Sequence, residues 1–324
     1  MTLKKIDSLI DFQIFITKEY SITLLLMKNK PILIVAGEPK STFIEIFLNF
    51  YNSKFFKKAN LTFVLIVSKK LLYYNLKLFK KKISINLVDE KLNGLDKKKL
   101  NVIDVPLDKI SLNTKNIISF NKYLSKSFDT GLRLMKQNKC SALINGPIFK
   151  KSFLKGKYKG ITEYLAKKTK SRSEVMLIYN SKLSVSPLTT HLPINKVTQS
   201  IKKDQIVSKI LRIHDFYINK LKFRPKIAVT GLNPHCESFN YKSNKEKSEI
   251  IPAIKKLKKF KINVKGPMSA DTIFLKSNLD KFDVIFGMYH DQVLGPMKTI
   301  FGFNAINITI GLPFIRITPD HGPN

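Results

Sequence analysis

Tryptophan is absent from this chain of 324 residues, and cysteine, histidine and arginine are scarce. The two cysteines, Cys140 and Cys236, lie far apart in sequence, which excludes a disulfide-stapled scaffold and indicates reduced thiols. With only 13 glycines and 14 prolines the chain is neither collagen-like nor of low complexity. Its 44% hydrophobic content predicts a globular protein with a sizeable core.

The shortage of arginine affects how the high positive charge of the chain is interpreted. A formal net charge of +35 suggests a nucleic-acid partner, but only five of the 58 basic residues are arginine. Sequence-specific readers of nucleic acid use arginine and stacked aromatic side chains, and no motif of that kind is present. We therefore expect the lysines to cover outer helix faces and predict no specific nucleic-acid partner. Charge alone keeps a nucleic-acid-binding protein among the hypotheses.

Long uncharged apolar runs are also missing. Charged side chains interrupt residues 1–30 at Asp7, Asp11, Lys18 and Glu19, and no small-residue cleavage site follows. The sequence therefore predicts a cytoplasmic protein without a membrane partner.

Short apolar runs alternate with segments of helical spacing. The expected strands are residues 31–36, 61–67, 83–88, 141–144, 174–179, 183–188, 227–229 and 306–310. The expected helices include residues 42–51, 116–137 and 195–220. This alternation is typical of an α/β fold, in which helices pack around a parallel or mixed sheet.

Three of the five histidines occur in one repeated pattern. His191, His235 and His290 each follow an apolar strand and a few turn residues. Three imidazoles at strand ends can converge on one divalent cation and leave coordination positions for a substrate. Their separations form no local metal motif, so unrelated histidines that cap turns are the alternative. Asp271 is a further carboxylate that can orient an imidazole or take a proton.

The richest stretch is residues 282–321. An apolar strand is expected to meet a loop at Tyr289-His290-Asp291-Gln292, and Lys298, Asn307 and Arg316 follow. Ammonium, amide and guanidinium groups near strand ends favour a cleft for a small anionic substrate, and a surface loop with a chance His-Asp pair is the alternative. Lys150, beyond the strand at residues 141–144, is either an anion contact or one more solvated lysine.

Six motifs occur along the chain in a fixed order: NGPIFK, TTHLP, GLNPH, GPMSADTIF, MYHDQ and NITIGLPFIRITPDHG. In this order they resemble the 4-hydroxythreonine-4-phosphate dehydrogenase family of pyridoxal phosphate (vitamin B6) biosynthesis. The resemblance implies a two-domain α/β/α fold like that of isocitrate and isopropylmalate dehydrogenases, with a cleft between the domains. It also implies a homodimer with its active site at the interface. Residues 31–324 would form two intertwined α/β subdomains, and residues 1–30 an N-terminal extension of unknown role.

The same resemblance assigns roles to residues. The positions that match the metal ligands are His191, His235 and His290, and those that match substrate contacts are Thr162, Lys298, Asn307 and Arg316. Asp271, Asp291 and Lys150 are candidate supporting residues. The implied activity is NAD-dependent (or NADP-dependent) oxidation of 4-phosphooxy-L-threonine and decarboxylation to 3-amino-2-oxopropyl phosphate. The implied metal is zinc, cobalt or magnesium.

The chain departs from the family pattern at several points. Ile161 precedes Thr162 where the family has a histidine that contacts substrate, and isoleucine cannot donate a hydrogen bond to phosphate. Most glycines of the loop after residue 36 and of the loop after His235 are replaced. Two further hypotheses follow: a relative that oxidises another four-carbon hydroxy-acid phosphate, and a metal-binding paralogue without turnover.

Overall fold

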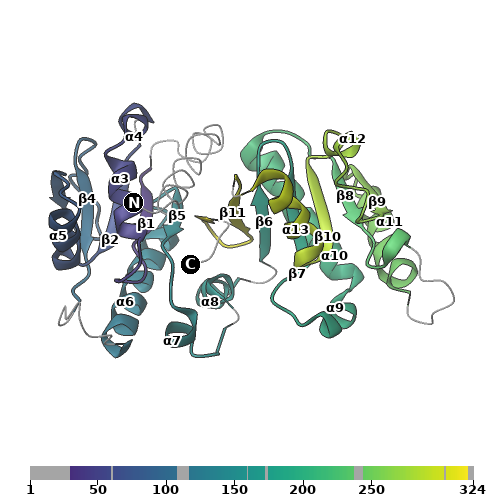
Figure 1. Ribbon diagram of the computed structural model, residues 1–324, viewed down its shortest axis with the longest axis horizontal. Helices are drawn as coiled ribbons and strands as arrows, with labels where there is room; N and C mark the ends of the chain where they lie inside the picture. Colours follow the sequence, from purple (N-terminus) through teal and green to yellow (C-terminus); the bar gives the residue numbers. More distant parts are fainter. Residues whose placement is uncertain are drawn as a thin grey trace. The chain divides into compact units, whose positions relative to one another are not determined.

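The computed structural model describes residues 30–59, 61–107, 117–158, 160–171, 174–236, 244–302 and 304–319 (Figure 1). The chain divides into two compact units. Unit 1 takes residues 1–170 and 312–324, and unit 2 takes residues 171–311. Residues 1–29, which make up nearly all of the expected N-terminal extension, lie outside the described residues. No helix in the described part of the chain is long and apolar enough to cross a membrane.

Unit 1 contains a six-stranded parallel sheet in the order β3-β4-β2-β1-β5-β12. Its strands are β1 (Ile32–Val35), β2 (Phe63–Val67), β3 (Ile85–Leu87), β4 (Leu100–Asp104), β5 (Ala142–Asn145) and β12 (Ile315–Pro319). Its helices are α3 (Phe43–Tyr51), α4 (Lys54–Ala59), α5 (Lys69–Leu78), α6 (Ile117–Lys136), α7 (Lys150–Leu154) and α8 (Ile161–Lys168).

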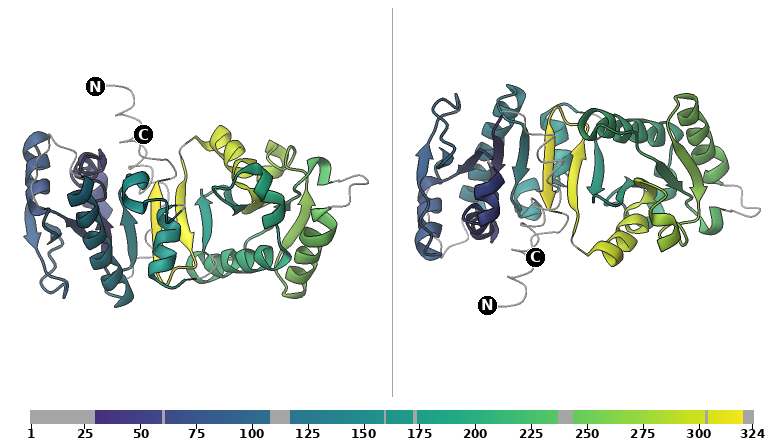
Figure 2. Two further views of the ribbon diagram at one scale, coloured as in Figure 1. Left: turned by 90° about the horizontal axis from the view of Figure 1, so that it is seen from below. Right: turned by 90° about the horizontal axis from the view of Figure 1, so that it is seen from above.

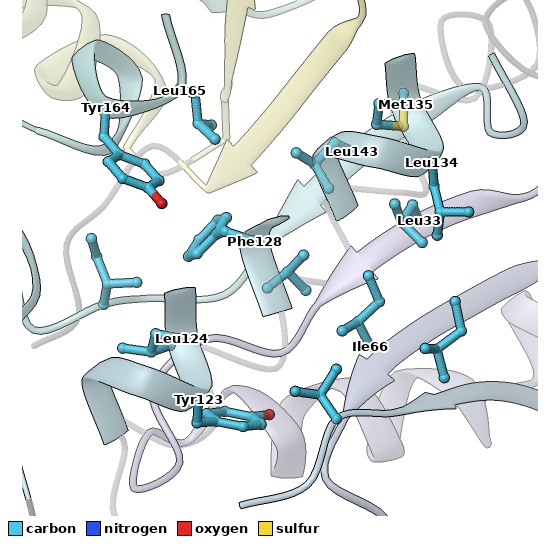
Figure 3. Packing of buried hydrophobic residues seen from close by; sticks show 14 of the residues in the cluster. Leu33, Ile66, Tyr123, Leu124, Phe128, Leu134, Met135, Leu143, Tyr164 and Leu165 are labelled. Carbon is cyan, nitrogen blue, oxygen red and sulfur yellow. The ribbon is translucent and has the colours of Figure 1, made fainter. Parts of the chain in front are cut away.

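Strands β1 and β2 in the middle of this sheet are buried on both faces, which explains why they read as continuous apolar runs. On one face Leu33 and Ile66 pack with Phe128 of α6 and Leu165 of α8 in a single hydrophobic cluster (Figure 3). On the other face Phe63 makes edge-to-face contacts with Phe47 and Phe50 of α3.

Unit 2 contains strands in the order β11-β6-β7-β10-β8-β9. Strands β7, β10, β8 and β9 are parallel, and β6 runs antiparallel to both β7 and β11. The strands are β6 (Val175–Tyr179), β7 (Ser184–Thr189), β8 (Ile227–Thr230), β9 (Val264–Met268), β10 (Val284–Tyr289) and β11 (Ile306–Ile310). The helices are α9 (Ile194–Ser200), α10 (Lys203–Phe216), η1 (Tyr217–Leu221), η2 (Pro234–Cys236), η3 (Glu246–Ile250), α11 (Ile251–Lys259), α12 (Lys276–Leu279) and α13 (His290–Phe301).

Helices α10 and α13 cover opposite faces of the unit 2 sheet (Figure 2). Val293 and Met297 of α13 pack with Val185 and Ile285 in one core cluster. On the α10 side, Tyr217 donates a hydrogen bond of 2.9 Å to Ser184 at the start of β7. The prediction of an α/β fold with helices around a mixed sheet is confirmed.

The prediction of one continuous helix over residues 195–220 is wrong. Helix α9 ends at Ser200, Ile201 and Lys202 are extended, and α10 begins at Lys203. The Glu249 carboxylate accepts a hydrogen bond of 2.7 Å from the Lys203 backbone NH. A carboxylate at a helix N-terminus satisfies a donor that lacks a partner within the helix, so a residue distant in sequence stabilises the new helix start.

The prediction of a loop after β10 is also wrong, because α13 begins at His290 itself. The helix continues through the Gly295-Pro296 pair. Val293, Leu294 and Met297 on one side of α13 are buried, so core packing outweighs the low helix propensity of the pair.

Candidate functional site

The three candidate histidines follow three neighbouring parallel strands of unit 2. His191 follows β7, His235 follows β8 and His290 directly follows β10, and β10 pairs with both other strands. The carboxyl ends of parallel strands lie at one edge of a sheet, where open α/β sheets bind ligands. The ring centroids of His191 and His290 are 6.1 Å apart. The structure therefore brings two of the three imidazoles together.

Two of the three histidines have a backbone conformation that they share with several surface residues of the chain. His191 and His235 have φ angles of 51° and 55°, in the left-handed region that non-glycine residues rarely adopt. Such conformations cost free energy and concentrate at binding and catalytic sites. His290 Nδ1 lies 2.8 Å from Asp291 Oδ1. The Asp291 side chain is 89% exposed. Its contact engages Nδ1 of His290 and leaves Nε2 for another partner.

Metal binding by these residues stays a prediction. Within the described ranges, no group of three or more His, Cys, Asp or Glu side chains is placed to hold a metal ion. The donor chemistry nevertheless fits a divalent metal, since neutral imidazoles are its common ligands and a carboxylate already orients His290. Asp271 is exposed and follows β9, which runs parallel to β8. It therefore lies at the same carboxyl edge of the sheet as the three histidines.

The loop that carries His235 is held by a buried carboxylate. Glu246, which is 1% exposed, accepts hydrogen bonds of 2.8 Å from the backbone NH groups of Leu232 and Asn233. The Asn233 side chain donates a further bond of 3.0 Å. Burial raises the pKa of the Glu246 carboxyl, but the hydrogen bonds from Asn233 and Leu232 outweigh burial and hold this pKa below its usual value.

Unit 1 contains a separate polar cluster around Arg316. The guanidinium, on a residue only 2% exposed, donates bonds of 2.9 Å to Asn145 Oδ1 and to Thr162 Oγ1. Burial lowers the pKa of Arg316 to about 10, and the nearby Glu163 charge opposes that shift. The side chain therefore stays charged at neutral pH. Glu163 Oε2 is buried and accepts no hydrogen bond. Two of the four expected substrate contacts, Arg316 and Thr162, thus touch each other.

The remaining expected residues lie in less enclosed positions. Lys298 is half-buried in the last turn of α13, and Lys150 is exposed at the start of α7. Asn307 pairs with Ile178 in register, and its Oδ1 is buried without a hydrogen-bond partner. Because Ile178 pairs in turn with Val185, Asn307 is level with the amino end of β7. The register therefore separates it from the strand ends that precede the histidines.

The departures from the family pattern have visible structural correlates. Ile161 begins α8 and packs, partly buried, against the hydrophobic core of unit 1. Gly37 is retained with a φ of 79°, and a Cβ there would lie 2.5 Å from the Pro147 carbonyl oxygen. This glycine is needed where the loops after β1 and β5 meet.

Sequence reasoning missed Glu246 and the structural role of Gln292. Glu246 is one acid in a lysine-rich segment, and nothing in its neighbours indicates burial. Gln292 belongs to the polar cluster after β10, but its partners come from other strands. Asn145 stands at a strand end, which is the one signal that could have identified it.

Two α/β units with polar side chains at the carboxyl ends of parallel strands have the architecture of a dehydrogenase-type α/β enzyme. The crystal structure of 4-hydroxythreonine-4-phosphate dehydrogenase from Klebsiella pneumoniae superposes with a TM-score of 0.78 at 26% identity, and covers 91% of this chain and 92% of that one. Residues 59–324 match the family described as pyridoxal phosphate biosynthetic protein PdxA, and the chain belongs to this family.

Two relatives make the match more specific. The 4-hydroxythreonine-4-phosphate dehydrogenase of Aquifex aeolicus is 36% identical over 299 residues, or 91% of this chain and 90% of its own length. The D-threonate 4-phosphate dehydrogenase of Pectobacterium atrosepticum is 31% identical over 69% of this chain and 70% of its own length. The expected family is thereby confirmed, and the chain is a dehydrogenase whose family implies a nicotinamide cofactor and a divalent metal.

Proposed function

We propose that this chain oxidises 4-phosphooxy-L-threonine with NAD and then decarboxylates it, in pyridoxal phosphate biosynthesis. The observation that carries the proposal is the identity of 36% with the Aquifex aeolicus enzyme over 91% of the chain. Hydride leaves the substrate carbon that bears the hydroxyl and passes to the nicotinamide, while the hydroxyl proton passes to a base. The resulting 3-keto acid loses its carboxylate as CO2 and takes up a proton, giving 3-amino-2-oxopropyl phosphate.

The histidines at the strand ends would hold the divalent metal. When bound, such a metal polarises the substrate oxygen that loses its proton and stabilises negative charge during decarboxylation. His191, His235 and His290 supply three neutral imidazoles, a set that favours zinc or cobalt over magnesium, which prefers oxygen ligands. The contact between His290 Nδ1 and Asp291 supports this role, because a carboxylate on one ring nitrogen fixes the other as the ligand.

Arg316 and Thr162 would bind one anionic end of the substrate. A buried guanidinium attracts a phosphate or carboxylate more strongly than an exposed one does, because less water screens it. Asn145 fixes the orientation of Arg316 from the opposite side. Lys298 and Asn307 would bind the remaining polar groups on the strength of family resemblance alone, because the register places Asn307 level with the amino end of β7. Nicotinamide dependence and a homodimeric state rest on family membership alone.

A second candidate substrate is D-threonate 4-phosphate. The relative from Pectobacterium atrosepticum carries that name and matches more than two thirds of the chain. The two substrates share a phosphate, a carboxylate and an oxidisable hydroxyl. They differ in carrying an ammonium or a hydroxyl beside the carboxylate, so the same oxidation and decarboxylation apply to both.

Purified protein tests both candidates directly. We expect NADH formation from 4-phosphooxy-L-threonine in the presence of zinc or cobalt, none after chelation, and a much lower rate with D-threonate 4-phosphate. A higher kcat/KM with D-threonate 4-phosphate would replace the first candidate by the second. If neither substrate yields NADH or NADPH with any of the three metals, the chain is a paralogue without turnover, and both proposals fail.

A further inference from the structure

One buried side-chain amide connects two of the three strand ends that precede the histidines. Gln292, in the first turn of α13, is 8% exposed. Its Oε1 accepts bonds of 2.7 Å from the Met288 backbone NH and 2.9 Å from Thr230 Oγ1. Its Nε2 donates a bond of 2.8 Å to the Gly231 carbonyl oxygen. The amide therefore bridges the end of β10 to the end of β8.

The third strand end joins the same network through Met288. Thr189, the last residue of β7, donates a bond of 2.9 Å to the Met288 carbonyl oxygen. The two peptide groups of Met288 are thus held by side chains on either side. Along the chain His191 is two residues beyond Thr189, and His290 is two beyond Met288. His235 follows Gly231 by four residues. Each candidate ligand is therefore tied to this network by a short segment.

The Gln292 side-chain amide joins β10 and β8 beyond the point where their backbone pairing ends. Backbone pairing between β10 and β8 runs from Val284–Ile227 to Phe286–Val229 and goes no further. Met288 and Gly231 lie beyond the last pair, and Gln292 joins them there. Gly287 makes room for this arrangement, because a Cβ at that position would collide with Val293 and lie 3.1 Å from Gln292 Oε1.

We infer that Gln292 is the positioning residue that sets the spacing between His290 and His235, with Thr189 extending the same control to His191. This inference rests on the proposed metal site. Gln292 itself would touch neither metal nor substrate. A buried amide with both ends engaged has one favoured orientation, so it transmits the geometry of one strand end to the next. Partners of this kind, outside the ligands themselves, typically change metal affinity by about 10- to 100-fold when removed.

The test compares Gln292→Met with a matched control. Methionine is unbranched and similar in size, so it fills the site but removes all three hydrogen bonds. Tyr217→Phe removes the buried bond to Ser184 at the opposite end of β7. Equilibrium dialysis with cobalt should show a dissociation constant raised about 10- to 100-fold for Gln292→Met and within about twofold of wild type for Tyr217→Phe. The cobalt absorption spectrum should change only in Gln292→Met.

A milder variant and a ligand variant separate the outcomes. Thr230→Val keeps side-chain shape, leaves Gln292 two of its bonds and should give an intermediate loss of cobalt affinity, whether or not Gln292→Met folds. His235→Ala should abolish tight binding. If His235→Ala binds cobalt as wild type does, the proposed metal site is wrong. If His235→Ala loses cobalt while Gln292→Met, or in its absence Thr230→Val, keeps wild-type affinity and spectrum, the metal site stands and the positioning inference is wrong.

Discussion

Replacing Glu246 by glutamine should destabilise the protein although the side chain keeps its size. The carboxylate accepts bonds from two backbone NH groups, those of Leu232 and Asn233, and from the Asn233 side-chain amide. A glutamine oxygen can keep the two backbone bonds, but without charge. Its NH2 group then faces the Asn233 NH2 group, so a hydrogen bond becomes a donor–donor contact.

The magnitude follows from the bond count. A hydrogen bond to a charged group contributes about 1.5–3 kcal/mol and a neutral one about 1 kcal/mol. Weakening two bonds and losing a third should lower the free energy of unfolding of Glu246→Gln by about 2–4 kcal/mol. Glu249→Gln is the matched control, because Glu249 lies in the same helix and accepts one backbone bond, from Lys203. It should lose about 1–2 kcal/mol, since one hydrogen bond is weakened and the ion pairs with Lys202 and Lys245 are lost.

The effect should depend on pH with a defined sign. Burial raises the pKa of Glu246, but hydrogen bonds hold it below its usual value in the folded state. Its charge therefore stabilises the fold above the unfolded pKa of about 4.3, and this contribution is lost as pH falls through the folded pKa. Urea unfolding of wild type and Glu246→Gln should show a constant difference from about pH 8 to 6 that shrinks below about pH 5. Equal stability at neutral pH, or a difference that grows on acidification, would refute this reasoning.

Three further outcomes are expected. Arg316→Lys keeps the charge but not the planar fork that binds Asn145 and Thr162, so KM for the phosphorylated substrate should rise at least about tenfold in steady-state kinetics, and an unchanged KM would remove Arg316 from the site. Ile161→His should lower KM while costing about 1–2 kcal/mol of stability from lost core packing, and a KM that stays the same or rises would show that position 161 does not contact substrate. Binding to nucleic acid should be equally weak for defined and scrambled sequences and should vanish at about 0.2 M salt, whereas sequence-selective retention would contradict a passive charge.

The sequence predicts most strands here because they are buried on both faces, but β4, β9 and β12 were not predicted, although β4 is buried along most of its length. Residues such as Leu33 and Ile66 must be apolar whichever side they face, so the strands are readable as continuous runs. Helix boundaries depended on remote partners. The break before Lys203 is stabilised by Glu249, and the helix through Pro296 by packing of Val293 and Met297. Local patterns contain neither kind of information.

The candidate site divides in the same way. Histidines that follow apolar strands could be identified because strand ends are a place where ligands bind. The residues that hold them could not, because Glu246 binds the backbone of Leu232 from 14 residues further along the chain, and Gln292 in α13 binds Thr230 at the end of β8. The contact of Gln292 can be recognised only when the sheet order β7-β10-β8 is known.

Unit 1 is assembled from two separated stretches of chain, and this has a consequence for synthesis on the ribosome. Residues 30–170 emerge before unit 2, and β12 emerges only after the whole of unit 2. Until then β5 pairs only with β1, and Asn145 and Thr162 have no hydrogen bond from the guanidinium of Arg316. Unit 2 is continuous and can fold while the ribosome still holds the last strand. Residues 30–170 are therefore translated before unit 2 but complete their sheet only after it.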